Sequence, residues 1–156
     1  MRDTITIKIS IPPDADGYVL LQCQHCGSFF KAAANDIESD EVLNIYCPSC
    51  GLISENYYTD DVIELARAKA LNVANDIIHN TFKNWERHNS PKSPLKFKAG
   101  KKPKDVYESP IRSIIDNLEI KDYPCCNRSA KINPLIKMSA CYCPCCGVIS
   151  FDDEQN

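Results

Sequence analysis

Ten cysteines are the residues of this chain best suited to chemistry. Cys23, Cys26, Cys47 and Cys50 follow the spacing Cys-x2-Cys-x20-Cys-x2-Cys. Each Cys-x2-Cys turn can point two sulfurs at one spot, and two such turns complete the tetrahedral four-thiolate site that Zn²⁺ takes in structural sites. Buried thiols or disulfides are the alternative interpretation. Two matched turns at this spacing favour a metal site.

A repeated segment predicts half of a second site. The sequence of Tyr46–Ser54 recurs 96 residues later as Tyr142–Ser150, with seven of nine positions identical. The glycine after the second cysteine of each copy allows positive φ where the backbone reverses. Cys143 and Cys146 are therefore predicted to ligate a second metal ion.

The upstream half of this second site is degenerate. At an offset near 100 residues Cys126 matches Cys26, but Tyr123 stands where Cys23 would lie, and a phenol cannot replace a thiolate. Cys125, beside Cys126, is the obvious substitute.

Two further cysteines bear on this assignment. Cys141 is the other candidate for the fourth ligand, whereas Cys145 aligns with Ser49 and is not expected to bind. We predict a second site made of Cys125, Cys126, Cys143 and Cys146. A decayed ribbon without a metal ion remains the alternative.

Both cysteine units resemble zinc ribbons of the rubredoxin-like knuckle class, over about residues 18–54 and 119–151. The resemblance implies two small β units holding two Zn²⁺ ions. Zinc ribbons occur in transcription factors, polymerase subunits, nucleic-acid enzymes and protein adaptors. The resemblance therefore implies a metal site and not an activity.

Length and composition bound the class of protein. A ribbon of about 35 residues buries too little apolar surface to fold alone, so the metal must supply folding energy. The N-terminus shows no secretory leader pattern, and no stretch approaches the ~20 apolar residues of a membrane span. Zinc-type cysteine spacing in such a chain predicts the reducing cytoplasm and no membrane partner.

Three further segments have the patterns of regular structure. Strict alternation over Thr4–Ile11 predicts a strand, which covers the first ribbon or pairs with the sheet edge of a partner. An apolar stripe from Thr59 to His88 predicts a long helix, either the spine of the molecule or a dimer interface. Ser109 and Pro110 are typical of a helix start and predict a short helix over 109–118.

Together these segments predict an α+β fold of two small zinc-ribbon β units joined by a long amphipathic helix and a short second helix. The expected divisions are an N-terminal strand plus ribbon 1 (1–58), the long helix (59–88), a Lys/Pro-rich linker (89–108), the short helix (109–118), and ribbon 2 with an acidic tail (119–156).

Charge is distributed unevenly along the chain. Residues 91–140 carry 11 basic and 5 acidic side chains, whereas 1–90 carry 7 and 13. Six lysines fall within 92–104, where they could neutralise phosphates or simply keep a linker solvated. Phe97 could stack on an unpaired base. The predicted nucleic-acid contacts are Lys92, Lys96, Phe97, Lys98, Lys101, Lys102, Lys104, Arg128 and Lys131.

These features favour a non-enzymatic role, because a four-thiolate site leaves no open metal position for catalysis. We predict a zinc-binding accessory, adaptor or regulatory protein that contacts nucleic acid through 92–104 and ribbon 2. One alternative is a purely protein–protein adaptor that works through the ribbons and the 59–88 helix, as a homodimer or with another protein. The other is a thiol or iron redox protein.

Overall fold

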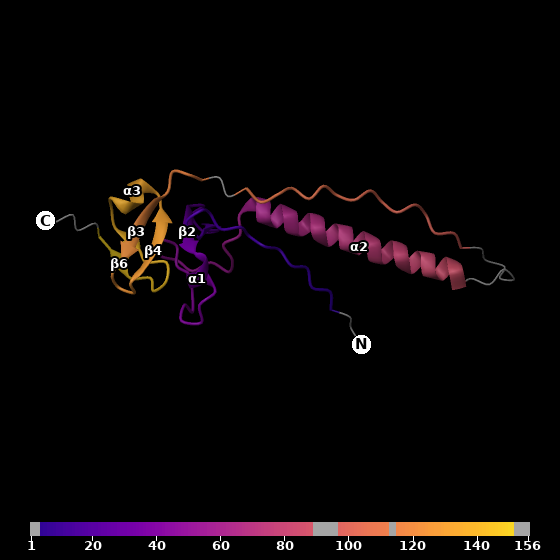
Figure 1. Cartoon of the computed structure of the whole chain (residues 1–156), viewed down its shortest axis with the longest axis horizontal. Helices are drawn as coiled ribbons and strands as arrows, with labels where there is room; N and C mark the ends of the chain where they lie inside the picture. The colour runs from indigo at the N-terminus through magenta and orange to yellow at the C-terminus, as the bar shows by residue number, and fades with distance from the viewer. Residues whose placement is uncertain (1–3, 89–96, 113–114, 152–156) are drawn as a thin grey trace. The chain divides into compact units, whose positions relative to one another are not determined.

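A computed structural model describes residues 4–88, 97–112 and 115–151. The chain divides into two compact units. The sheet unit comprises residues 11–60 and 111–156, and the helix unit comprises 1–10 and 61–110. All described strands belong to the sheet unit, and the long helix α2 belongs to the helix unit (Figure 1). The predicted α+β class is confirmed.

The sheet unit is built on one four-stranded antiparallel sheet of order β1-β2-β4-β3. Its strands are β1 (Tyr18–Gln22), β2 (Phe29–Ala33), β3 (Glu119–Tyr123) and β4 (Arg128–Ile132). The central strands β2 and β4 pair with Lys31 opposite Lys131. The hairpins β1–β2 and β3–β4, predicted as parts of two separate ribbons, are thus joined in a single sheet. The Lys31–Lys131 pair marks an approximate local two-fold axis between them.

Period-two alternation explains how the strands deliver cysteines to the core. Val19, Leu21 and Cys23 all belong to the buried cluster of the sheet unit, as do Phe30 and Ala32 on β2. The same alternation buries Ala130 and Ile132 of β4. The alternation of β1 therefore places Cys23, the residue that follows the strand, in the same buried cluster as Val19 and Leu21.

The remaining elements of the sheet unit are short. They are α1 (Ala34–Ile37), α3 (Pro134–Lys137), β5 (Cys141–Tyr142) and β6 (Ile149–Ser150). Helix α3 starts at Pro134 because the Asn133 side chain accepts a hydrogen bond from the Leu135 N–H and proline suits the first turn. Strands β5 and β6 flank the second copy of the repeat, and an isolated bridge between Tyr46 and Ile53 does so for the first.

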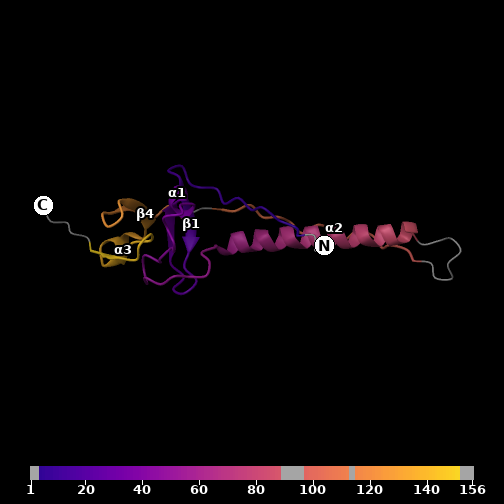
Figure 2. The same cartoon turned by 90° about the horizontal axis from the view of Figure 1, so that it is seen from below.

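The helix unit contains α2 (Asp60–His88), as predicted from the apolar stripe. Its 29 residues give a length of about 43 Å. Residues 97–110 run beside α2 in an extended conformation, which both views show (Figures 1 and 2). The Asn72 side chain accepts a hydrogen bond from the Val106 N–H at 2.7 Å and donates one to the Val106 carbonyl at 3.0 Å. Lys102 forms an ion pair with Asp76 at 2.6 Å.

The predicted strand over Thr4–Ile11 is wrong. The described residues 4–11 form no strand, and Ile5 remains 56% exposed. Alternation gives a strand only where a neighbouring edge accepts its hydrogen bonds, and this segment pairs with neither edge of the four-stranded sheet. Only Ile11, at its end, packs against the core of the sheet unit.

The predicted helix over 109–118 is also wrong. Residues 109–112 and 115–118 are not helical, and 113–114 lie outside the described residues. A helix this short is marginal without a surface to pack on. Ile115 and Leu118 instead line an open cleft of about 610 Å³ together with Phe29 and Ile136.

Candidate metal centres

The first candidate centre brings together the four predicted cysteines. The Sγ atoms of Cys23, Cys26, Cys47 and Cys50 all lie within 4.8 Å of one another. The Cys23–Cys50 pair is 3.8 Å apart and the Cys26–Cys47 pair 3.5 Å. Metal–sulfur bonds of about 2.3 Å in a tetrahedron place the sulfurs about 3.8 Å apart, so this geometry fits a metal ion.

Tight backbone turns aim these sulfurs. The N–H of Gly27 donates to the Cys23 carbonyl at 2.8 Å, and the N–H of Gly51 donates to that of Cys47 at 2.8 Å. Both glycines have positive φ, +73° and +70°, a conformation that costs glycine little. His25, which lies between Cys23 and Cys26 in the sequence, donates its Nε2–H to the Ile53 carbonyl at 3.1 Å and stays out of the group.

The second candidate centre contains Cys125, Cys126, Cys143 and Cys146, whose sulfurs also lie within 4.8 Å of one another. Cys125 approaches Cys146 at 3.3 Å, as Cys23 approaches Cys50 in the first centre. Cys125 thus takes the place of Cys23.

The other two cysteines of ribbon 2 stay outside this group. Cys141 accepts a hydrogen bond from the Tyr123 hydroxyl at 3.8 Å and is fully buried. Cys145 packs against the core of the sheet unit. All ten cysteines lie in the described part of the chain and are free thiols.

The departure of ribbon 2 from the repeat has a structural explanation. Tyr123 ends β3 where Cys23 follows β1, and its side chain is only 1% exposed. The Tyr123 ring fills core volume, so the thiol that joins the group lies two residues further on, at Cys125. Asn127 takes the place of Gly27 with φ of +54°, and asparagine is among the residues that tolerate this conformation.

Electrostatics explain why each group suits a cation. Burial raises the pKa of Cys47 and of Cys125 above the usual value of a thiol. For Cys23 burial acts in the same direction, but N–H donors of the knuckle, from Cys26 and His25, lower its pKa to about 6. Four crowded thiols cannot all ionise beside one another unless a positive charge sits between them. A divalent cation would supply that charge.

The two knuckles also hold each other through reciprocal contacts. The Tyr46 N–H donates to the Pro144 carbonyl at 2.8 Å, and the Tyr142 N–H donates to the Pro48 carbonyl at 2.9 Å. A Cβ added at Gly51 would lie 2.8 Å from ring carbons of Tyr142, and one added at Gly147 would lie 2.8 Å from the ring of Tyr46. Each tyrosine therefore packs on the glycine of the other knuckle.

Sequence reasoning missed these reciprocal tyrosine–glycine contacts, although the sequence contains a signal for them. Tyrosine precedes the first cysteine in both copies of the repeat, and glycine follows the second. Because the local two-fold carries each copy onto the other, one tyrosine–glycine contact occurs twice.

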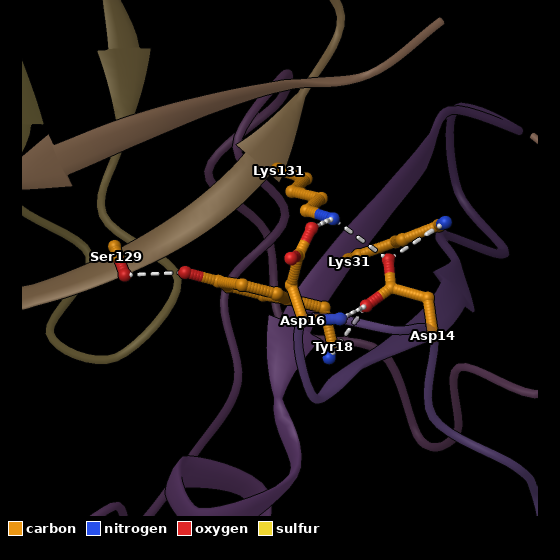
Figure 3. A network of polar contacts seen from close by, with 6 residues as sticks. All are labelled: Asp14, Asp16, Tyr18, Lys31, Ser129 and Lys131. Atoms are coloured by element: carbon orange, nitrogen blue, oxygen red, sulfur yellow. Dashed lines mark hydrogen bonds and ion pairs between the residues drawn. The ribbon is translucent and has the colours of Figure 1, made fainter. Parts of the chain in front are cut away.

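Sequence reasoning also missed a network of ion pairs and hydrogen bonds at the local two-fold (Figure 3). Asp14 Oδ2 accepts from Lys31 at 3.0 Å and from Lys131 at 2.9 Å, so one carboxylate joins the two central strands. Asp16 also pairs with Lys131, and the Tyr18 hydroxyl bonds Ser129 at 2.7 Å. Burial acts to raise the pKa of Asp14, but hydrogen bonds from Lys131, the Tyr18 N–H and Lys31 outweigh it and hold the pKa well below its usual range.

The substitution Asp14→Asn is expected to lower the free energy of unfolding by about 2–3 kcal/mol at pH 7, because it leaves two largely buried ammonium groups without their shared carboxylate. Asp16→Asn is the control, since that carboxylate is 61% exposed and meets Lys131 alone, and it should cost under about 1 kcal/mol. The folded pKa of Asp14 lies below the unfolded value of about 3.9, so its contribution is full above about pH 5 and is lost as pH falls through the folded value. Urea unfolding at pH 7 and 5.5 should show the same difference between wild type and Asp14→Asn. Equal free energies of unfolding for Asp14→Asn and Asp16→Asn would contradict the role of Asp14 as a bridge between the two lysines.

The predicted nucleic-acid contacts fall into three groups. Lys92 and Lys96 lie outside the described residues. Four of the remaining residues are engaged within the protein: Phe97 packs on Phe82 and Trp85, Lys102 pairs with Asp76 and Asp105, Arg128 with Asp36 and Glu41, and Lys131 with Asp14 and Asp16. Lys98, Lys101 and Lys104 are exposed, and they form no ion pair within the described chain.

Among the residues that the structure describes, no helix combines the length and apolar character needed to cross a membrane. No protein-family model, curated protein or solved structure matches the chain. The two groups of four cysteines, consistent with zinc-binding knuckles, are therefore the features from which a function can be argued.

Proposed function

We propose that this chain is a zinc-binding protein of the zinc-ribbon type, in which Zn²⁺ ions at both centres have a structural and not a catalytic role. The observation that carries the proposal is that each group offers four thiols, all within 4.8 Å. Four sulfur ligands complete a tetrahedral Zn²⁺ site, whereas catalytic zinc keeps one position open for water or substrate. The protein then acts as an accessory or adaptor that presents surfaces to a partner.

The position of the centres supports a structural role. Cys23, Cys47 and Cys143 belong to the same buried cluster as the strand side chains. Metal binding there would tie the knuckles to the sheet, and its free energy would count toward folding.

Native mass spectrometry of the purified protein tests the proposal. We expect two Zn²⁺ ions per chain, with loss of folded structure after chelation, followed by circular dichroism. Tetrahedral sulfur sites also accept iron. Iron in place of zinc would support the redox alternative, and a single ion would remove one centre from the proposal.

A second candidate function is contact with nucleic acid, favoured by one specific observation. Lys98, Lys101 and Lys104 are exposed at three-residue spacing on the extended segment 97–110, and no carboxylate in the described chain neutralises them. Lysines presented this way suit the phosphate backbone without base specificity.

The combined substitution of Lys98, Lys101 and Lys104 by Gln is expected to weaken binding to DNA or RNA and to reduce the salt slope by up to about 2.7 for duplex DNA, since each phosphate contact contributes about 0.9. Lys102→Gln is the matched control, because this neighbouring lysine already pairs with Asp76 and Asp105. Salt-dependent binding titrations give the slopes. An unaltered slope in the triple variant would leave the protein–protein adaptor as the working function.

A further inference from the structure

The two candidate centres differ in how their thiols are covered. In the first centre each close pair of sulfur atoms includes a fully buried one, because Cys23 and Cys47 are both 0% exposed. In the second centre Cys125 and Cys146 are both exposed, and their sulfur atoms lie 3.3 Å apart. An oxidant dissolved in water can therefore reach either sulfur of this second pair.

The turn that carries Cys125 is also held less tightly than the corresponding turn of ribbon 1. In ribbon 1 the Gly27 N–H donates to the Cys23 carbonyl at 2.8 Å. In ribbon 2 the Cys126 N–H lies 3.4 Å from the Tyr123 carbonyl, beyond the usual hydrogen-bond range of about 2.7–3.2 Å. The backbone therefore restrains the Cys125 sulfur less than it restrains the Cys23 sulfur.

The distances favour a disulfide at the same place. A disulfide bond is about 2.05 Å long, so the Cys125 and Cys146 sulfurs, at 3.3 Å, need to approach by about 1.3 Å in total. The Cys26 and Cys47 sulfurs start further apart, at 3.5 Å, and Cys47 belongs to the buried core cluster of the sheet unit. Close packing resists a shift of Cys47, whereas two exposed side chains can rotate toward each other.

The chemistry needs one two-electron oxidant, and hydrogen peroxide is sufficient. A thiolate attacks one peroxide oxygen, the O–O bond breaks, and a sulfenic acid forms with release of hydroxide. The second thiolate attacks that sulfur, the S–S bond forms, and the sulfenic oxygen leaves as a second hydroxide. Two protons from solvent convert both hydroxides into water. The two sulfurs have then lost two electrons and the peroxide has gained them.

We propose that Cys125 and Cys146 form a redox-sensitive modification site, at which peroxide joins them in a disulfide and thereby empties the second centre. Two of its four thiolates are lost to the bond, and the remaining pair cannot complete a tetrahedral site. The first centre keeps its four thiolates. Reduction of the disulfide restores the site, so ribbon 2 responds reversibly to oxidants. This inference rests on the proposed function, because it assumes that the second centre holds Zn²⁺.

The test starts from the full, reduced, zinc-loaded protein. A small excess of hydrogen peroxide is added, and a chromogenic chelator follows the release of Zn²⁺. We expect one of two ions to leave, at a rate about 10-fold or more above that of the other, because exposure controls access of the oxidant. Peptide mass spectrometry after alkylation should find Cys125 joined to Cys146. Dithiothreitol with added Zn²⁺ should restore two ions per chain.

Histidine variants separate the disulfide from metal binding. Histidine also ligates Zn²⁺, so Cys125→His leaves four ligands but removes the disulfide. Its release of Zn²⁺ by peroxide should be slower by about 10-fold or more. Cys26→His is the matched control, since it makes the same change at the exposed thiol of the first knuckle and should leave release from the second centre unaltered. Cys146→His repeats the test from the other sulfur if Cys125→His fails to load.

Two results would overturn the proposal. One is loss of both ions at equal rates, and the other is a mapped disulfide that joins a different pair, such as Cys126 with Cys143. The metal content before peroxide is added tests the proposed function separately. A second centre that is empty in the reduced protein would refute its zinc assignment and the release together. Disulfide mapping of that protein would still decide whether Cys125 and Cys146 are the pair that oxidises.

Discussion

Replacing Cys47 with serine is expected to abolish metal binding at both candidate centres and not at the first alone. A serine hydroxyl cannot supply the fourth thiolate, so the first centre would lose its ion and the knuckle around it its fold. The second centre depends on that knuckle, because Tyr142 packs on Gly51 and donates to the Pro48 carbonyl. Strands β2 and β4 also share one sheet. Unfolding of ribbon 1 should therefore remove these contacts from ribbon 2 and destabilise its fold.

Native mass spectrometry under mild chelation, with circular dichroism, would measure this effect. Cys145→Ser provides the control, since it makes the same substitution in the other knuckle and introduces the residue that ribbon 1 has at Ser49. It should retain two ions. A Cys47→Ser protein that keeps one ion as firmly as wild type would show that the two ribbons fold independently.

The second large effect is expected from Gly51→Ala, which should lower the free energy of unfolding by about 1–3 kcal/mol more than Gly27→Ala does. Both glycines follow the second cysteine of a knuckle and have nearly the same φ, +70° and +73°. The conformational cost of alanine, about 1–2 kcal/mol, is therefore common to both. They differ in surroundings: a Cβ at Gly27 meets nothing within 4 Å, whereas at Gly51 it would lie 2.8 Å from the Tyr142 ring.

Denaturant unfolding of the metal-loaded variants would separate these contributions. Gly147→Ala should behave like Gly51→Ala, because it meets Tyr46 at the same distance. Adding Tyr142→Leu to Gly51→Ala should cost less than the sum of the two single changes, since the smaller side chain relieves the clash. Equal decreases in the free energy of unfolding for Gly51→Ala and Gly27→Ala would mean that the reciprocal tyrosine–glycine contacts add nothing to stability.

The parts of this protein that the sequence alone determined are those set by local spacing. Two residues between paired cysteines dictate a knuckle, and the repeat of Tyr46–Ser54 at Tyr142–Ser150 dictates that there are two. Helix α2 was predictable for the same reason, because a 3.6-residue stripe over 29 residues has no other regular solution. The grouping of Cys125 with Cys126, Cys143 and Cys146 followed from the repeat once Tyr123 was set aside.

Tertiary structure decided everything that depends on a partner distant in sequence. The Thr4–Ile11 alternation has the pattern of a strand, but no sheet edge pairs with it. Conversely, Lys31 and Lys131 look like surface lysines in the sequence, and only the pairing of β2 with β4 brings both onto Asp14. The fold supplies the hydrogen-bond partners and the packing surfaces. A local sequence pattern can therefore indicate that a residue needs a partner, but it cannot show which residue that partner is.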